Sequence, residues 1–402
     1  MKIGIIGGGA SGMAAALWAA RSGNDVVLFE RQARVGRKLL ATGNGRCNLS
    51  NAKLDFSNYH GEDPDFAKYA LDFHSVEKTL GWFDSLGLYT VTEPSGRVYP
   101  YSDQANSVVD VLRFALQREN VELLTDFEVI KARKTGDGFL AESRNEQIFC
   151  DRLIVACGGL AGTKLGGTMS GYQLLRSFGH HATRLRPALV QVKSSWQGCT
   201  SLKGVRANCH AAIYHNNELY SQSTGELQFT QYGLSGPVIF EISRDVCQNG
   251  GDWVCKLDFL PDISEENLEN LLQSRRNKNL PVEDFLTGIL HNRLGRILTQ
   301  SAQIRGNRSS AELTEEEIHS ICEAIKNFEV TLTETLCMDS AQVTAGGILT
   351  SEFDPKTMES RIVPGLYACG EVLDIDGDCG GFNLQWAWSS GATAGISAGG
   401  GV

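Results

Sequence analysis

The chain opens with Lys2-Ile3-Gly4-Ile5-Ile6-Gly7-Gly8-Gly9-Ala10-Ser11-Gly12. In this stretch a short apolar strand is followed directly by Gly7-x-Gly9-x-x-Gly12. Ala14–Arg21 then has helical character, and Val26–Phe29 has the pattern of a second strand. This order is typical of a βαβ unit that binds a dinucleotide. The glycines allow a tight turn and a close approach to a pyrophosphate, and the helix N-terminus supplies free N–H donors. The predicted contacts in this turn are Gly7, Gly9, Ala10, Ser11 and Gly12.

Glu30 ends the second strand, eighteen residues after Gly12. An acidic residue at this place accepts hydrogen bonds from the ribose hydroxyls of the adenosine. It suits FAD or NAD and repels a 2′-phosphate. Glu30 is therefore predicted to hold the ribose of one of these two dinucleotides.

The end of the chain favours FAD. Gly365–Glu371 has the pattern of a strand that ends in a turn, and Gly380–Gln385 opens a helix that runs through Ala398. This order resembles the C-terminal flavin motif of two-domain FAD oxidoreductases, in which a second helix N-terminus faces the flavin pyrimidine ring and stabilises negative charge there. The predicted contacts in this region are Gly370, Glu371, Asn383 and Leu384.

The loop Gly36–Asn51, with the sequence GRKLLATGNGRCNLSN, follows the ribose-binding strand. Its cations and glycines suit a loop wrapped around a diphosphate, whereas a solvated basic loop would explain only the charges. The candidate cofactor contacts here are Arg37, Lys38, Gly43, Asn44, Gly45 and Arg46. For Arg46, an anion-binding role and a hydrogen bond to loop carbonyls are equally consistent with the sequence.

With these motifs the sequence resembles the YhiN/BaiN-type FAD-dependent oxidoreductases, also called aminoacetone oxidase family flavoproteins. The resemblance rests on Gly36–Asn51, on Phe229–Pro237 and on Gly365–Gly391. It implies an α/β fold: a Rossmann-like FAD-binding domain of the glutathione reductase type, with an inserted β-barrel and a small helical subdomain. It also implies FAD contacts at Ser11, Glu30, Arg37, Lys38, Gly43, Val129, Glu371, Asn383 and Leu384, with a second glycine turn at Gly158.

The chain departs from the family pattern at three places. Many members have His where this chain has Gln231, many have Tyr where it has Phe382, and some have Thr where it has Cys379. One branch of the family is linked to the reduction of conjugated dehydro-bile acids. Because Gln231 cannot act as an acid, that branch's substrate does not transfer to this chain on resemblance alone.

The residue pattern itself indicates an α/β domain interrupted by an insertion. Residues 1–189 and 341–402 are predicted to form the FAD-binding domain. Residues 190–262 and 328–340 carry short alternating strands and are predicted to form the barrel, with a hairpin turn at Asn216-Asn217. Residues 263–327 are charged and helical, with Ser264 and a Thr314-x-x-Glu317 capping box opening two helices.

Composition excludes several classes of protein. The 402 residues include 37 Lys and Arg against 47 Asp and Glu, a net charge of −10, which disfavours nucleic acid as a partner. No apolar run approaches the roughly eighteen residues of a membrane span. The N-terminus does not have the pattern of a signal peptide, so the 11 cysteines are expected to be reduced and the protein cytoplasmic. Neither a C-x-x-C pair nor a second Cys-His pair indicates a metal site.

Individual side chains carry weaker signals. Cys47 could pass electrons from a flavin, but such enzymes usually carry a second cysteine nearby, and a packed thiol is the favoured interpretation. Tyr232 and Ser235 could reach the flavin from the insertion, although turn geometry explains their segment equally well. The sequence assigns no catalytic acid or base and no oligomeric state.

The sequence therefore predicts an FAD-dependent oxidoreductase that transfers a hydride through flavin N5. The favoured reaction is reduction of an activated C=C bond in a small, bile-acid-like substrate, with NAD(P)H as a candidate donor. The substrate is expected between the FAD domain and the barrel, because pockets favour such places. Two alternatives stay open: an oxidase that uses oxygen on a small amine such as aminoacetone, and a flavin-binding sensor without turnover.

Overall fold

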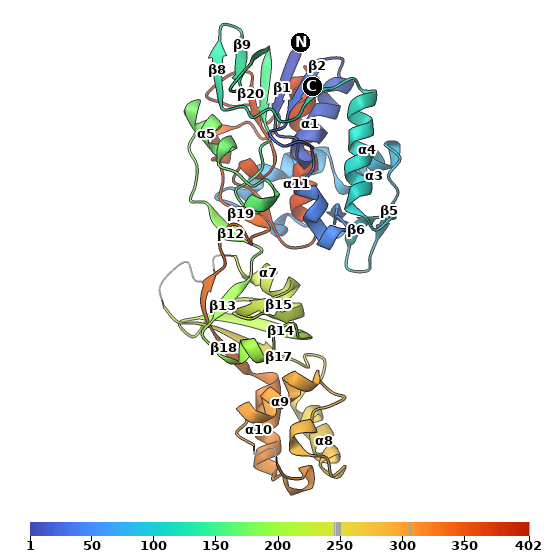
Figure 1. Ribbon diagram of the computed structural model, residues 1–402, viewed down its shortest axis with the longest axis vertical. Coiled ribbons are helices and arrows are strands. Elements are labelled where there is room, and N and C mark those ends of the chain that lie inside the picture. Colours follow the sequence, from blue (N-terminus) through green and yellow to red (C-terminus); the bar gives the residue numbers. More distant parts are fainter. Residues whose placement is uncertain (245, 247–250, 305–306, 402) are drawn as a thin grey trace. The chain divides into compact units, whose positions relative to one another are not determined.

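The structure is a computed structural model that describes residues 1–244, 246, 251–304 and 307–401. The chain divides into two compact units (Figure 1). Unit 1 contains Met1–Pro187 together with Ala341–Val402, and unit 2 contains Ala188–Ser340. Each unit is described by itself.

A five-stranded parallel sheet lies at the centre of unit 1, with the strand order β20-β11-β1-β2-β7. The strands are β1 (Lys2–Ile6), β2 (Asp25–Phe29), β7 (Glu122–Leu124), β11 (Arg152–Val155) and β20 (Leu366–Ala368). The three middle strands are almost entirely apolar and buried, as expected for a sheet that is covered on both faces. The predicted Rossmann-type α/β fold is confirmed.

Helices α1 (Ala10–Arg21) and α11 (Phe382–Ala398) pack closely in unit 1 (Figure 1). A Cβ at Gly391 would lie 2.5 Å from the carbonyl oxygen of Ser11, so the two backbones approach through glycine. The predicted start of the first helix at Ala14 is wrong by one turn. Gly9 has an extended backbone and serves as the N-cap, which leaves Ala10–Gly12 in the first turn of the helix.

The remaining elements of unit 1 surround this core. The helices are α2 (Ala67–Phe73), α3 (Val76–Ser85), α4 (Ala105–Arg118) and α5 (Ser170–Ser177). The strands are β3 (Ser50–Asn51), β4 (Tyr59–His60), β5 (Thr90–Thr92), β6 (Arg97–Pro100), β8 (Lys131–Thr135), β9 (Gly138–Glu142), β10 (Gln147–Cys150), β19 (Val343–Ala345) and β21 (Asp376–Gly377). A further strand, β12 (Arg186–Ala188), lies where the chain passes from unit 1 to unit 2.

Two strand predictions in unit 1 need correction. The run Gln147–Val155 is two strands, because β10 pairs antiparallel with β9 whereas β11 pairs parallel with β1. The strand expected over Glu128–Ala132 begins only at Lys131. Val129 therefore precedes β8 instead of lying within a strand.

Unit 2 contains a closed barrel of six strands, in the order β13-β16-β15-β14-β17-β18. The strands are β13 (Val192–Ser194), β14 (Arg206–His215), β15 (Glu218–Phe229), β16 (Gly233–Ser235), β17 (Trp253–Asp258) and β18 (Phe328–Thr335). Asn216 and Asn217 join β14 to β15 with φ values of 50° and 67°, which is the geometry of a tight two-residue hairpin. The predicted barrel and its hairpin turn are confirmed.

The helices of unit 2 are α6 (Gly198–Ser201), α7 (Pro237–Ile242), α8 (Glu265–Arg276), α9 (Asn292–Ser301) and α10 (Glu315–Lys326). The two predicted N-caps are confirmed. Ser264 Oγ accepts a hydrogen bond from Asn267 N at 3.3 Å. Thr314 and Glu317 form the reciprocal capping box, in which Glu317 Oε2 accepts from Thr314 N at 2.9 Å.

Candidate functional site

The glycine turn after β1 has the geometry that a pyrophosphate requires. Gly7 N donates to Phe29 O at 2.8 Å, and a Cβ at Gly12 would overlap the carbonyl oxygen of Gly7. At Gly9, in contrast, a Cβ would meet no atom within 4 Å. The first turn of α1 carries no acidic side chain. The free N–H groups of this turn therefore face open space beside Gly9, where nothing acidic on the helix opposes an anion.

Glu30 is held beside this turn by two backbone groups. Its Oε2 accepts from Gly8 N at 2.9 Å, and its Oε1 accepts from Gln32 N at 2.8 Å. A carboxylate oxygen has more than one lone pair, so both oxygens keep the capacity to accept from the two hydroxyls of a ribose. The side chain is thus orientated as the sequence predicts for a ribose acceptor.

The basic loop begins against the glycine turn. Gly36 N donates to Gly8 O at 2.8 Å, and Arg37 Nη1 donates to Gln32 Oε1 at 3.0 Å. Lys38 reaches across the sheet, and its Nζ lies 2.8 Å from Glu371 Oε2. The structure thereby brings together three predicted contact segments: the glycine turn after β1, the basic loop and the turn at Glu371.

Two further glycine turns follow the neighbouring strands β11 and β20. Gly158, after β11, has a φ of 69°, and a Cβ at the adjacent Gly159 would lie 2.5 Å from Glu371 Oε1. Gly370, after β20, has a φ of 76°, and a Cβ there would lie 2.5 Å from Ser11 Oγ. Since β20, β11 and β1 are adjacent and parallel, their carboxyl ends gather all three turns at one edge of the sheet.

Helix α11 begins close to this edge, and its N-cap is Gly381. The first turn contains Asn383 and Leu384, has no acidic residue and has no side-chain cap, so its N–H groups stay available to a ligand. The Asn383 side chain has a structural role: its Oδ1 accepts from Gly377 N at 2.8 Å and its Nδ2 donates to Gly377 O at 2.6 Å. Contacts from Asn383 and Leu384 to a flavin would therefore come from their backbone.

Arg46 lies apart from these contacts. Its Nη2 donates to Glu93 Oε1 at 3.0 Å, its Nε donates to Asp103, and its guanidinium lies 3.9 Å from the centre of the Tyr99 ring. These hydrogen bonds raise the pKa of Arg46. Glu93 and Asp103 accept hydrogen bonds from the guanidinium nitrogens that a phosphate would need. The structure therefore supports a role in which Arg46 anchors the loop to these two carboxylates, instead of binding an anion or loop carbonyls.

Three other predicted positions lie apart from the assembled turns in the described part of the chain. Asn44, with a φ of 56°, and Gly45 are exposed in the loop. Val129 is buried, and the next residue, Ile130, donates its N–H to Glu142 O at 2.9 Å. The predicted contact of adenine with the Val129 backbone stays a prediction.

Three cysteines of unit 1 are poor redox groups. Cys47 is fully buried, and burial raises the pKa of its thiol to about 12. Burial likewise raises the pKa of Cys157 and of Cys369 to about 12. A raised pKa suppresses the thiolate that redox chemistry requires, so Cys47 is better interpreted as a packed loop thiol.

Sequence reasoning missed Thr344. Its N donates to Glu371 Oε1 at 2.8 Å, and its Oγ1 accepts from Ala161 N at 2.9 Å. Thr344 thereby joins the C-terminal turn to the turn after β11. A single Thr directly after the insertion carries no motif, and only the folded chain shows its role.

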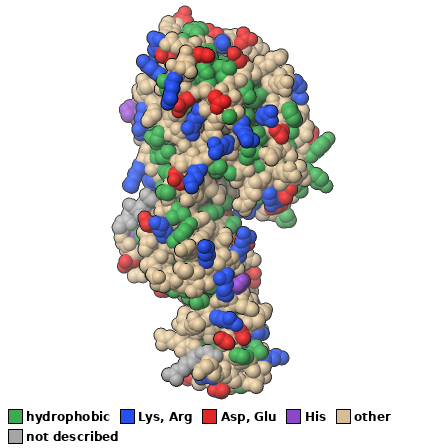
Figure 2. Space-filling model, viewed as in Figure 1, with side chains coloured by type: hydrophobic (Ala, Val, Ile, Leu, Met, Phe, Trp, Pro, Cys, Tyr) green, Lys and Arg blue, Asp and Glu red, His purple; other side chains and the backbone are tan. Residues whose placement is uncertain are grey.

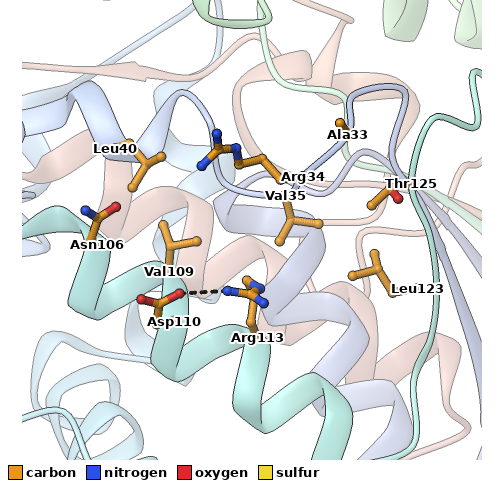
Figure 3. Close-up of a pocket in the computed structure, with 10 residues that line it drawn as sticks. All are labelled: Ala33, Arg34, Val35, Leu40, Asn106, Val109, Asp110, Arg113, Leu123 and Thr125. Carbon is orange, nitrogen blue, oxygen red and sulfur yellow. Dashed lines mark hydrogen bonds and ion pairs between the residues drawn. The ribbon is translucent and has the colours of Figure 1, made fainter.

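One hollow in unit 1 lies apart from the predicted FAD contacts. A cavity of about 450 Å³ lies between the loop that follows β2 and helix α4, where Asp110 and Arg113 form an ion pair of 2.8 Å (Figure 3). It is lined by Ala33, Arg34, Val35, Leu40, Asn106, Val109, Asp110, Arg113, Leu123 and Thr125. None of these residues is a predicted FAD contact.

The described residues hold neither a metal cluster nor a membrane-spanning helix. They contain no group of three or more His, Cys, Asp and Glu side chains arranged to hold a metal ion. In the same part of the chain, no helix is long and apolar enough to cross a membrane.

Residues 1–397 match the family described as "HI0933-like protein Rossmann domain". The chain is 41% identical to a 3-dehydro-bile acid delta(4,6)-reductase of Clostridium scindens, over 99% of this chain and 98% of that protein. It is 32% identical to a ribosomal RNA dihydrouridine synthase of Escherichia coli, over 96% and 95% of the two chains.

Among solved structures, the chain is similar to a 3-ketosteroid delta1-dehydrogenase from Sterolibacterium denitrificans, with a TM-score of 0.51. The match covers 99% of both chains at 12% identity, so it is evidence of a common fold alone. The family match shows that the chain is an FAD-dependent oxidoreductase of this family. The glycine turns, Glu30 and the free N-terminus of α11 make this edge of the sheet the candidate FAD-binding region.

Proposed function

Because the chain belongs to the HI0933-like Rossmann-domain family, we propose that it is an FAD-dependent reductase of a carbon–carbon double bond conjugated to a carbonyl group, in a small organic substrate. One observation carries this proposal: the 41% identity, over 99% of the chain, to a protein named as a bile-acid delta(4,6)-reductase. The relatives named as dihydrouridine synthases support the same reaction type, because dihydrouridine is uridine with its 5,6 double bond reduced.

The residues of this chain have distinct parts in such a reaction. When bound, FAD supplies the hydride through its N5 atom. The N–H groups at the start of α1 suit its pyrophosphate, and the Glu30 carboxylate suits its ribose. The N-terminus of α11 favours the negative charge that builds up on the pyrimidine ring during reduction. The Lys38–Glu371 ion pair holds two of these segments together.

A small molecule suits this chain better than RNA. Unit 2 contains 13 Lys and Arg but 20 Asp and Glu, which is a net charge of −7. On the visible face, basic and acidic side chains are interspersed in both units (Figure 2). RNA binding draws much of its affinity from phosphates on a basic surface. We therefore infer that the substrate is bile-acid-like, and that the polynucleotide substrate of the two dihydrouridine synthases is not shared.

NAD(P)H is the electron donor in this proposal. The acid-ended strand that would complete a second nucleotide site does not follow Gly158–Gly162 in the sequence. The donor would thus reduce the flavin without a dinucleotide-binding domain of its own.

The test is anaerobic stopped-flow spectroscopy of the holoenzyme. NADH or NADPH is expected to bleach the flavin band, and a 3-oxo-4,6-diene steroid acid is expected to restore it rapidly. The saturated steroid acid is the matched control and should leave the flavin reduced. Reoxidation by a uridine-containing RNA but not by the diene would contradict the small-molecule substrate.

Two other outcomes would contradict the reaction type. Flavin reduction by aminoacetone, followed by fast reoxidation with oxygen, would show an amine oxidase. Inertness to every organic acceptor, with only slow reoxidation by oxygen, would show a flavin-binding sensor. The Gly9→Ala protein, which is expected to bind FAD at least tenfold more weakly, controls for turnover by contaminating enzymes when it is assayed without added FAD.

A further inference from the structure

The hollow beside helix α4 has an apolar floor (Figure 3). Its apolar lining comes from three elements: Val35 and Leu40 from the loop after β2, Val109 from α4 and Leu123 from β7. Val35 and Val109 are buried, and Leu40 and Leu123 are partly buried, so these side chains form the base of the hollow. A volume of about 450 Å³ is in the range of sites that hold small organic molecules.

The charged side chains of the lining leave one positive charge without a partner. Arg113 Nη1 donates to Asp110 Oδ1 at 2.8 Å, so these two charges compensate each other. Arg34 has no hydrogen bond or ion pair with any other residue that the structure describes. Figure 3 accordingly shows a dashed line at Arg113 and none at Arg34. Two arginines and one aspartate give the lining a net charge of +1.

Two neutral polar side chains complete the lining. Asn106 and Thr125 are exposed, and each carries a hydrogen-bond donor. One cation, two neutral donors and an apolar floor suit a molecule that has a single anionic group and an apolar body. A net charge of +1 balances one carboxylate but not a dianionic phosphate, and Arg34 would repel a cation.

The hollow and the glycine turn lie on opposite sides of the segment Val35–Gly36. Gly36 N donates to Gly8 O at 2.8 Å, on the side of the glycine turn. A Cβ at Gly36 would lie 2.9 Å from Val109 Cγ2, on the side of the hollow. The backbone of this segment therefore separates a molecule in the hollow from the expected position of the pyrophosphate.

We propose that the hollow is a second ligand site, which binds a small organic monocarboxylate with an apolar body in addition to FAD. The Arg34 guanidinium donates to the carboxylate, and the body of the ligand covers the four apolar side chains of the floor. This inference rests on no assumption about the reaction at the flavin.

The first test is isothermal titration calorimetry of the FAD-loaded protein with 2-naphthoate. The matched control ligand, 2-naphthamide, has the same ring system without the charge and should bind about tenfold more weakly. Arg34→Gln should weaken the binding of 2-naphthoate about tenfold and leave that of the amide unchanged, because it removes a charge-assisted hydrogen bond. Equal affinities for 2-naphthoate in Arg34→Gln and the parent, or no binding by the parent, would overturn the proposal.

The matched control protein is Arg118→Gln. Arg118 is exposed on α4 but does not line the hollow. This variant loses the same charge as Arg34→Gln and should bind 2-naphthoate like the parent. If it weakens binding as much as Arg34→Gln does, the ligand responds only to the overall charge of the protein, and the proposed site is wrong.

The second test locates the ligand by methyl NMR of the FAD-loaded protein. Nuclear Overhauser effects are expected from the naphthyl protons to the methyl groups of Val35, Leu40, Val109 and Leu123. Effects confined to other methyl groups would overturn the proposal. The FAD-free protein should bind 2-naphthoate with the same Kd, and loss of binding in the presence of FAD would show that the hollow belongs to the cofactor site. Neither test uses turnover, so a failed reductase assay would contradict the proposed reaction without affecting this result.

Discussion

Lys38 Nζ lies 2.8 Å from Glu371 Oε2, and the two residues are 333 positions apart in the sequence. Their side chains are only 32% and 19% exposed. Glu371 also accepts from Thr344 N, which fixes the carboxylate from a second side. This ion pair joins the basic loop after β2 to the turn after β20, two segments that both carry predicted FAD contacts.

Removing the positive charge should loosen that junction. Lys38→Met is expected to lower the affinity for FAD by about fivefold, because one partly buried ion pair contributes about 1 kcal/mol. Fluorescence titration of the apo-protein measures the effect. Lys193→Met is the matched control, since it breaks the exposed Lys193–Glu334 pair of 2.7 Å in unit 2. If the two variants have the same Kd, the ion pair has no part in cofactor binding.

Gly9→Ala tests the pyrophosphate position. Gly9 has a φ of −82°, which alanine adopts freely, and its Cβ would meet no protein atom within 4 Å. The variant should therefore fold normally but bind FAD at least tenfold more weakly, because the methyl group occupies the space for the pyrophosphate.

The control for Gly9→Ala is Gly81→Ala. Gly81 lies within α3 and also has open space around its Cβ. Alanine there should stabilise the protein by about 0.5–1 kcal/mol through helix propensity and leave FAD affinity unchanged. An unchanged Kd for FAD in Gly9→Ala would show that the pyrophosphate lies elsewhere.

Glu30→Ala tests the ribose contact. Loss of charge-assisted hydrogen bonds to the ribose should cost about 1.5–3 kcal/mol, roughly a tenfold to hundredfold rise in the Kd for FAD. Because Glu30 also accepts from Gly8 N, the thermal stability of the apo-protein should be measured in parallel. Glu30→Gln retains one acceptor oxygen and should give an intermediate Kd. An unchanged Kd for Glu30→Ala would place the ribose away from this side chain.

His74 should make the protein sensitive to acid. Burial lowers the pKa of His74 from 6.5 to about 4, so the folded state favours the neutral ring. The neutral His74 ring stabilises the folded state fully above pH 6.5, and this stabilisation is lost as the pH falls towards 4. At pH 5 the loss amounts to about 2 kcal/mol in the free energy of unfolding.

Urea unfolding at pH 7.5 and pH 5 checks this prediction, with His74→Phe as the comparison. The phenyl ring keeps the aromatic contacts to Trp18 and Trp82 but has no group that titrates. The parent should lose about 2 kcal/mol more than the variant between the two pH values. Equal losses would mean that His74 does not contribute to acid sensitivity.

Several features could be predicted from the sequence because they depend on neighbouring residues. The strand, glycine turn and helix at residues 2–21, the acid at Glu30 and the hairpin turn at Asn216 are set by local backbone geometry and hydrogen bonds. The capping box of Thr314 and Glu317 spans one helical turn. Because each of these features depends on residues close together in the sequence, the sequence alone predicts them. From them it also predicts the FAD-binding fold.

Contacts between residues that are distant in the sequence were evident only from the tertiary structure. The sequence could not distinguish whether Arg46 binds an anion or loop carbonyls. In the folded chain its guanidinium instead contacts Glu93 and Asp103. The split between β10 and β11 follows from the different sheets in which they pair. The hydrogen bond from Ser50 Oγ to Gln385 Oε1 likewise joins residues 335 positions apart. Such contacts depend on chain segments that only folding brings together, so the order of residues alone does not specify them.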